Sequence, residues 1–189
     1  MDTAPPSDRP VDVLNRKEVY AQLFAILTNR RKDAENNLII GLSDPDLRQV
    51  LGMDTEELQE LLKEFNEHIL GLGLTVVEYH YRGFVWYAMK SMYSAPIELS
   101  EEELAVLGTF IMLCEKHESQ KIEAVELTDY LIQRNYFSDF KLKKLLQALQ
   151  ANGYLERLGK FLNFGPRSLI EFSDEGRTQI AAQANDLLF

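Results

Sequence analysis

One stretch of the sequence decides the fold: residues Asp54 to Met89, which read DTEELQELLKEFNEHILGLGLTVVEYHYRGFVWYAM. Its first half carries apolar residues three and four positions apart, the spacing of one helix face, and Asp54 is a residue type that caps helix N-termini. After Gly71 and Gly73 the sequence becomes rich in β-branched and aromatic residues on both sides of Arg82-Gly83, which is typical of a hairpin turn. The stretch therefore predicts a helix followed by a β-hairpin.

The residues before this stretch predict three further elements. Apolar residues on one face indicate a helix over residues 15–31, and the run Leu38-Ile39-Ile40 indicates a short strand. Ser43 is placed to cap a brief helix that ends near Leu51. The resulting order, helix, strand, helix, helix and hairpin, is that of a winged-helix domain.

The same order begins again in the second half of the chain, about 80 residues later. Ser100 opens the motif Ser-Glu-Glu-Glu, which is a capping box at the start of a helix. A short strand over residues 121–125, a helix over 127–135 and a third helix capped by Ser138 follow, and a second hairpin turns at Gly159-Lys160. The repeated order predicts two winged-helix modules in tandem.

The predicted fold class is mainly α with small β-hairpins (α+β). The dipeptide Gly165-Pro166, after the second hairpin, is expected to form a fixed turn. The expected divisions of the chain are a flexible leader (1–12), a first winged-helix domain (13–90), a linker (91–99), a second winged-helix domain (100–172) and a C-terminal helix (173–189).

Catalytic and cofactor-binding patterns are missing from the sequence. It contains no glycine-rich phosphate loop of the Walker or Rossmann type. Its three histidines are scattered, without cysteines or paired carboxylates at metal-ligand spacing. The single cysteine, Cys114, lies in an apolar run and is expected to be a small buried residue. We therefore expect a protein that is not an enzyme and that uses no metal and no cofactor.

Charge and hydropathy narrow the class of protein further. The chain carries 30 acidic and 20 basic residues, a net charge of −10, which argues against a protein whose whole surface wraps nucleic acid. No apolar run reaches the roughly 20 residues of a membrane span. A local basic patch is still compatible with this composition, because charge can be distributed unevenly over the surface.

The two helices that precede the hairpins differ sharply in charge. The first, over residues 54–70, carries six acidic residues against Lys63 alone and would repel phosphate. The second, over residues 138–152, carries three lysines, and more basic residues follow it. Such residues supply charge for non-specific phosphate contact but little base recognition; the alternative is a solvated basic face. The candidate DNA-binding residues are Lys141, Lys143, Lys144, Arg157, Lys160 and Arg167.

The first hairpin carries more apolar and aromatic residues than one buried face requires. A hairpin that is apolar on both faces indicates a second surface, either for a partner protein or for packing between the two domains of the chain. We favour a protein interface there. Its candidate residues are Tyr79, Tyr81, Phe84, Trp86 and Tyr87.

Two parts of the sequence resemble the kleisin-interacting tandem winged-helix (KITE) proteins of SMC complexes. The segment from Glu64 to Leu74, with the hairpin ending Trp86-Tyr87-Ala88-Met89, is similar to the first module of the winged-helix subunits of the eukaryotic DNA-repair SMC complex. The segment from Lys143 to Glu156, with Gly165-Pro166-Arg167 after the second hairpin, resembles the end of a MAGE domain. In its short length the chain is more like the prokaryotic relatives ScpB and MukE.

The resemblance implies an accessory subunit that dimerises, with itself or with another winged-helix protein, and grips a segment of the kleisin that bridges two SMC ATPase heads. It also implies weak non-specific contact with DNA, no membrane, and a location on the nucleoid in the cytoplasm, or in the nucleus of a eukaryote. One relative carries a zinc-binding RING. The single cysteine of this sequence cannot form one, so ubiquitin-ligase activity is not implied.

Other functions are built on the same fold, which alone does not separate them. A DNA-binding transcription regulator is the main alternative. The acidic helix over residues 54–70 disfavours it, whereas the lysines at 141–144 permit it. A tandem winged-helix adaptor of another assembly is a third possibility, against which only the Gly165-Pro166-Arg167 motif argues.

Overall fold

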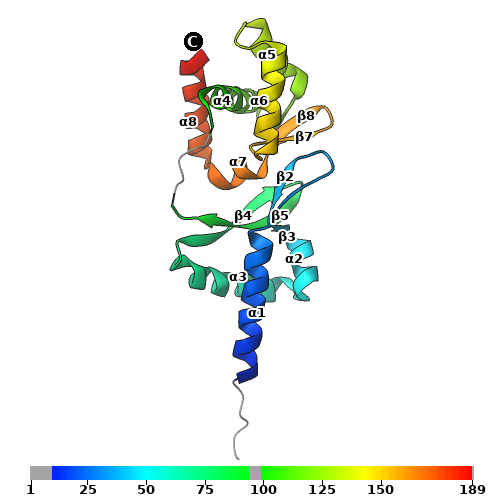
Figure 1. Cartoon of the computed structure of the whole chain (residues 1–189), viewed down its shortest axis with the longest axis vertical. Coiled ribbons are helices and arrows are strands. Elements are labelled where there is room, and N and C mark those ends of the chain that lie inside the picture. Colours follow the sequence, from blue (N-terminus) through cyan, green and yellow to red (C-terminus); the bar gives the residue numbers. More distant parts are fainter. Residues whose placement is uncertain (1–9, 94–98, 189) are drawn as a thin grey trace, which may run out of the picture.

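The computed structural model describes residues 10–93 and 99–188 and shows two modules stacked along the long axis of the molecule (Figure 1). Each module places three helices against a three-stranded antiparallel sheet, and the first module's hairpin of β4 (Leu74–Tyr81) and β5 (Phe84–Ser91) lies between the two sets of helices. Each module has its own buried core. The prediction of tandem winged-helix modules, mainly α with small β-hairpins, is confirmed.

The first module follows the predicted order of elements with one addition, a small hairpin before the second helix. The cap residues Ser43 and Asp54 are confirmed, because each side chain accepts a hydrogen bond from a backbone N–H in the first turn of its helix. Its elements are α1 (Pro10–Leu27), β1 (Arg30–Lys32), β2 (Leu38–Ile40), β3 (Leu42–Ser43), α2 (Asp44–Leu51), α3 (Thr55–Leu70), β4 (Leu74–Tyr81) and β5 (Phe84–Ser91).

The turn between β4 and β5 is formed as the sequence predicts. Arg82 and Gly83 have φ angles of 52° and 80°, the left-handed pair that a two-residue hairpin turn with the twist of its strands requires. The register then places Tyr81 opposite Phe84 and Tyr79 opposite Trp86. Since successive residues of a strand point to opposite faces, this register fixes which aromatic side chains face α3 and which face away.

The predicted short strand of the first module was placed wrongly. Residues 38–40 do not join the sheet of the β4–β5 hairpin; they pair with β1 in a separate two-stranded sheet. The strand that does join β5 is β3, just after Gly41. The cause is a reversal at Gly41, whose φ is 73°, so the apolar run ends before the chain reaches the sheet.

The second module repeats the order, and the predicted caps Ser100 and Ser138 are both confirmed. Its sheet has the order β6-β8-β7, like β3-β5-β4 in the first module. Its elements are α4 (Glu101–Lys116), β6 (Lys121–Glu123), α5 (Ala124–Gln133), α6 (Asp139–Ala151), β7 (Leu155–Leu158), β8 (Phe161–Phe164), α7 (Pro166–Glu171) and α8 (Asp174–Leu188).

Two expectations for this module need correction. Gly165-Pro166 is not a free-standing turn: Gly165 is the N-cap and Pro166 the first residue of α7, a position where proline needs no N–H partner. Helix α8, predicted as a separate division of the chain, packs into the second module, because Ile180 and Ala181 belong to its core. A Cβ at Gly108 of α4 would lie 2.3 Å from the Cβ of Ala184, so glycine there lets the two helices approach closely.

The predicted boundaries at the ends of the first module also shift. Helix α1 begins at Pro10, inside the segment predicted as a leader, and β5 extends to Ser91, inside the predicted linker. The rest of the predicted leader and most of the linker lie outside the described residues. Among the helices that the structure describes, none combines the length and the apolar character needed to cross a membrane.

Candidate functional site

The two modules meet along an apolar seam, formed by β2, the β4–β5 hairpin and α7 (Figure 1). The hairpin supplies the aromatic residues of the seam, and Leu169 and Ile170 of α7 cover them from the second module. Alternate residues of β4 and β5 point to the seam, and the others point to the core beneath α3. The buried residues of the seam are Ile39, Ile40, Tyr79, Tyr81, Trp86 and Ala88.

A charged cluster closes one edge of the seam. Glu156 of β7 is 2% exposed and accepts hydrogen bonds from the Tyr81 hydroxyl at 2.5 Å and from Nε of Arg82 at 2.6 Å. The same guanidinium forms an ion pair with Asp33, in the turn after β1. Both modules therefore contribute to one network in which a buried carboxylate is neutralised across the seam.

The network also sets the protonation of its members. Burial favours a higher pKa for Asp33, but hydrogen bonds from Arg82 and Asn37 outweigh it and hold the pKa of that carboxyl below its usual value. Burial, and then the hydrogen bond to Glu156, raises the pKa of the Tyr81 hydroxyl. Asp33 is consequently charged and Tyr81 neutral at physiological pH, as the hydrogen bonds require.

Asn37 joins the modules at the other side of the β1–β2 turn. It is fully buried. Its Nδ2 donates a hydrogen bond to the carbonyl oxygen of Arg157 at 3.2 Å, and its Oδ1 accepts one from the backbone N–H of Arg157 at 3.0 Å. Gln150 of α6 donates to the same Oδ1 at 3.0 Å. One side chain thus occupies the pairing groups of β7, as a neighbouring strand would.

This seam corrects the prediction of a partner interface on the first hairpin. Tyr79, Tyr81 and Trp86 are buried against the second module, and Tyr87 is buried against α3, where its hydroxyl accepts a hydrogen bond from Gln59. Only Phe84, 54% exposed, lies on the surface. The apolar second face is explained by packing between the two modules, the alternative that the sequence also allowed.

The predicted basic cluster is largely neutralised. Lys141 pairs with Glu102, Lys143 with Asp139, Lys160 with Glu123 and Arg167 with Glu171. Lys144 lies over the ring of Phe140, 4.5 Å from its centroid, and Nε of Arg157 bonds the carbonyl oxygen of Gly159. The guanidinium of Arg167 also lies over the ring of Tyr154. Four of the six candidate cations therefore have a carboxylate partner.

A more open basic strand was missed in the sequence. Strand β1 consists of Arg30, Arg31 and Lys32, all exposed, and none of the three forms an ion pair within residues 10–93 and 99–188. Its hairpin lies beside β7, to which Asn37 ties it. The predicted helix over residues 15–31 includes Arg30 and Arg31, whereas the helix of the structure stops at Leu27.

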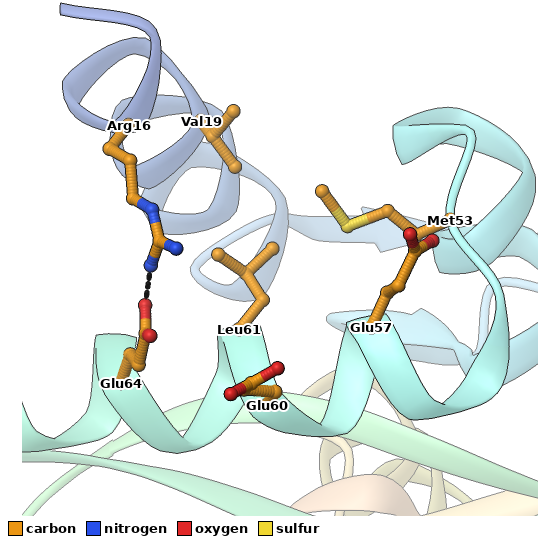
Figure 2. Close-up of a pocket in the computed structure, with 7 residues that line it drawn as sticks. All are labelled: Arg16, Val19, Met53, Glu57, Glu60, Leu61 and Glu64. Carbon is orange, nitrogen blue, oxygen red and sulfur yellow. Dashed lines mark ion pairs between the residues drawn. The ribbon is translucent and has the colours of Figure 1, made fainter. Parts of the chain in front are cut away.

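A groove opens on the far side of the first module, where α1 crosses α3 (Figure 2). Its volume is about 200 Å³. Its apolar lining comes from Val19 of α1, Leu61 of α3 and Met53, which lies in the segment between α2 and α3. In Figure 2 these three side chains point toward one another, and carboxylates stand along α3 beside them.

The charged residues of this groove are almost all acidic. Glu57, Glu60 and Glu64 rise from successive turns of α3, and Arg16 is the only cation in the lining. Arg16 pairs with Glu64 at one end, and Glu57 is held at the other by its bond to the backbone N–H of Asp54. Glu60, between them, forms no ion pair or hydrogen bond within the described parts of the chain. The groove thus combines an apolar floor with negative charge.

The local contacts of Cys114, His117 and His68 account for these three side chains. Cys114 is buried in the second core, where burial, followed by the charges of Glu126 and Glu115, raises the pKa of its thiol to about 12. His117 pairs with Glu126, and His68 bonds the Glu64 carbonyl group. Within the described ranges no three His, Cys, Asp or Glu side chains are grouped to hold a metal ion.

The comparison with solved structures finds a chain of the Nse1-Nse3-Nse4 complex, with a TM-score of 0.51. The two chains share 13% sequence identity, and the match covers 95% of this chain and 76% of that chain. No protein-family model and no curated protein sequence matches. The resemblance that the sequence suggested to winged-helix subunits of SMC complexes is therefore confirmed in the fold, over both modules.

Proposed function

We propose that this chain is a non-enzymatic accessory subunit of an SMC–kleisin complex, which pairs with a winged-helix partner and binds the kleisin. The observation that carries the proposal is the likeness, over 95% of the chain, to a chain that is itself part of a multi-protein assembly. A likeness restricted to one winged helix would fit many DNA-binding proteins. This one includes both modules.

The surfaces of the chain support a role in binding proteins rather than in reading DNA. Helix α3, which would enter the major groove in a DNA-reading winged helix, bears exposed carboxylates at Glu56, Glu57, Glu60 and Glu67. The lysines of α6, its counterpart in the second module, are mostly paired with acids. Neither helix carries an arginine, and Gln59 and Asn66 of α3 are held by hydrogen bonds within the module, so neither presents the arginine, asparagine and glutamine face that base recognition favours.

Purification of the tagged chain from its native cells at gentle salt, with mass spectrometry of the co-purifying chains, tests this function. We expect an SMC ATPase and a kleisin among the recovered proteins. Recovery of neither, together with nanomolar binding to one DNA sequence at physiological salt, would contradict the proposal and favour the transcription regulator.

We further propose that weak, non-specific DNA contact uses β1 rather than the lysines of α6. The double variant Arg30→Glu, Lys32→Glu should bind duplex DNA more weakly, because two phosphate contacts are lost and two repulsions are added. The slope of log K against log salt should fall by about 2, since each phosphate contact contributes about 0.9. Fluorescence anisotropy of a labelled duplex from 50 to 200 mM salt, roughly the range where such effects are large, measures both.

The matched control is the double variant Lys141→Glu, Lys143→Glu, which changes net charge by the same amount. We expect a smaller effect from it, because both lysines already face carboxylates. An equal or larger loss in this control would show that α6, and not β1, contacts phosphate.

A further inference from the structure

We infer that the groove between α1 and α3 binds the apolar face of a cationic amphipathic helix from another protein. The groove is defined by its lining residues Arg16, Val19, Met53, Glu57, Glu60, Leu61 and Glu64. The inference goes beyond the proposed function, because it assigns a surface and a partner chemistry that hold whichever assembly the chain joins.

The shape of the groove favours a helix as its occupant. It lies between two helices that cross, and its floor is made of aliphatic and thioether side chains from α1, α3 and the segment before α3 (Figure 2). A third helix can lay an apolar stripe into such a groove, with anchors spaced three and four residues apart. Leu61, only 7% exposed, joins this floor to the core of the module, so the site rests on a packed support.

The negative charge of the groove favours a bound helix that carries positive charge. Three carboxylates and one guanidinium leave a net charge of −2 around the floor. Lysine and arginine suit the rim, because their long stems cover apolar surface while their charged ends reach the carboxylates. Phosphate, nucleic acid and acidic peptides would be repelled, which excludes DNA as the occupant of this face.

Helix α1 extends the site. Its first turns project beyond α3 and the rest of the module (Figure 1). Helix propensity alone stabilises a segment that projects into water only weakly, because most helical stability in proteins comes from packing. A partner helix lying along the groove would have this projecting wall beside it.

The test uses the full chain and a fluorescein-labelled designed peptide, an 18-residue helix with leucine on one face and lysine on the others. Anisotropy should show binding that weakens as sodium chloride screens the rim charges. Glu60→Lys should weaken it roughly five- to tenfold, because reversal turns one exposed ion pair into a repulsion. Arg16→Gln should strengthen it about two- to fivefold, because it frees the Glu64 carboxylate from its pair.

Two controls separate the groove from general charge attraction. Asp129→Lys makes the same charge change at an exposed position of α5, in the other module, and we expect peptide binding to change less than about twofold. A peptide of identical composition with its leucines dispersed around the helix should bind weakly to every variant. Equal weakening by Asp129→Lys and Glu60→Lys, or equal binding of the dispersed peptide, would overturn the inference.

The mass of the chain in solution identifies a competing occupant. If the wild type is a dimer and Glu60→Lys a monomer, the groove holds a second copy and the inference of a separate partner is wrong. The proposed function is tested independently by the cell purification of the wild-type chain. Recovery of an SMC ATPase and a kleisin, with no binding of the peptide to the wild type, would reject the groove and keep the function. Binding of the peptide to the wild type, without SMC or kleisin recovery, would reject the function and keep the groove.

Discussion

Replacement of Arg82 by methionine is expected to destabilise the folded chain by about 3 kcal/mol. Among the described residues the guanidinium is the only cation paired with Glu156, whose side chain is 3% exposed. Without it, the Tyr81 hydroxyl is the one side-chain donor that the described residues still offer to the buried carboxylate, and a buried charge without its counter-ion is costly. Methionine keeps most of the apolar stem, so the loss reports on the charge.

Urea unfolding followed by the fluorescence of Trp86 measures this effect where it occurs, because the chain has one tryptophan and it lies in the seam. Circular dichroism of the same samples reports on the helices of both modules. A matched control is Arg48→Met, which removes a half-buried i,i+4 pair with Asp44 within α2. We expect it to cost less than about 1 kcal/mol.

The double variant Arg82→Met, Glu156→Gln decides whether the buried charge is the cause. Removing both charges should cost less than removing the arginine alone, because no unpaired carboxylate remains. A double variant that is less stable than Arg82→Met by the full cost of a separate Glu156→Gln change would show that the two residues act independently. The seam would then be held by its apolar residues alone.

Local signals in the sequence were sufficient for most elements. The caps at Ser43, Asp54, Ser100 and Ser138 lie within a few residues of the helices that they begin, and Arg82-Gly83 carries its own turn conformation. Each signal depends on interactions within one turn of backbone. The tandem order followed from these signals without any knowledge of long-range contacts.

Several of the parts that sequence analysis missed depend on contacts between distant residues. The apolar second face of the first hairpin was visible, but whether Leu169 of the same chain or a partner covers it is decided by how the modules stack. The acidic residues of α3 were also visible, yet a groove exists only because α1 crosses them. Ion pairs such as Lys141–Glu102 join residues 39 positions apart, so the lysines seemed more available than they are.

Gly41→Ala is expected to be among the most disruptive single changes and to lower the free energy of unfolding by at least about 3 kcal/mol. Gly41 has a φ of 73°, and an added Cβ would lie 2.0 Å from the carbonyl oxygen and 2.9 Å from the carbonyl carbon of Tyr87. Both atoms belong to the backbone of β5, so no side-chain rotation relieves the contact. The variant must separate β3 from β5 or leave the turn.

Gly52→Ala isolates the contribution of the contact. Gly52 has a similar φ of 67°, but an added Cβ there would meet no atom within 4 Å. Gly52→Ala should therefore lower the free energy of unfolding only by the strain of a non-glycine residue at positive φ, about 1 kcal/mol. The difference between the two variants, measured by urea unfolding with both probes, then gives the cost of displacing β3.

Displacement of the backbone at Gly41 should also disturb the seam and the basic strand β1, because Gly41 connects β2 to β3. Before it, β2 carries Ile39 and Ile40 into the seam and holds the basic strand β1; after it, β3 completes the sheet beneath α3. Gly41→Ala is expected to red-shift Trp86 emission and to weaken the DNA contact proposed for β1, even at temperatures where the helices remain folded. Equal stability of the Gly41 and Gly52 variants, with unchanged Trp86 emission, would mean that β5 yields to the added methyl group and that the two surfaces are not coupled through this turn.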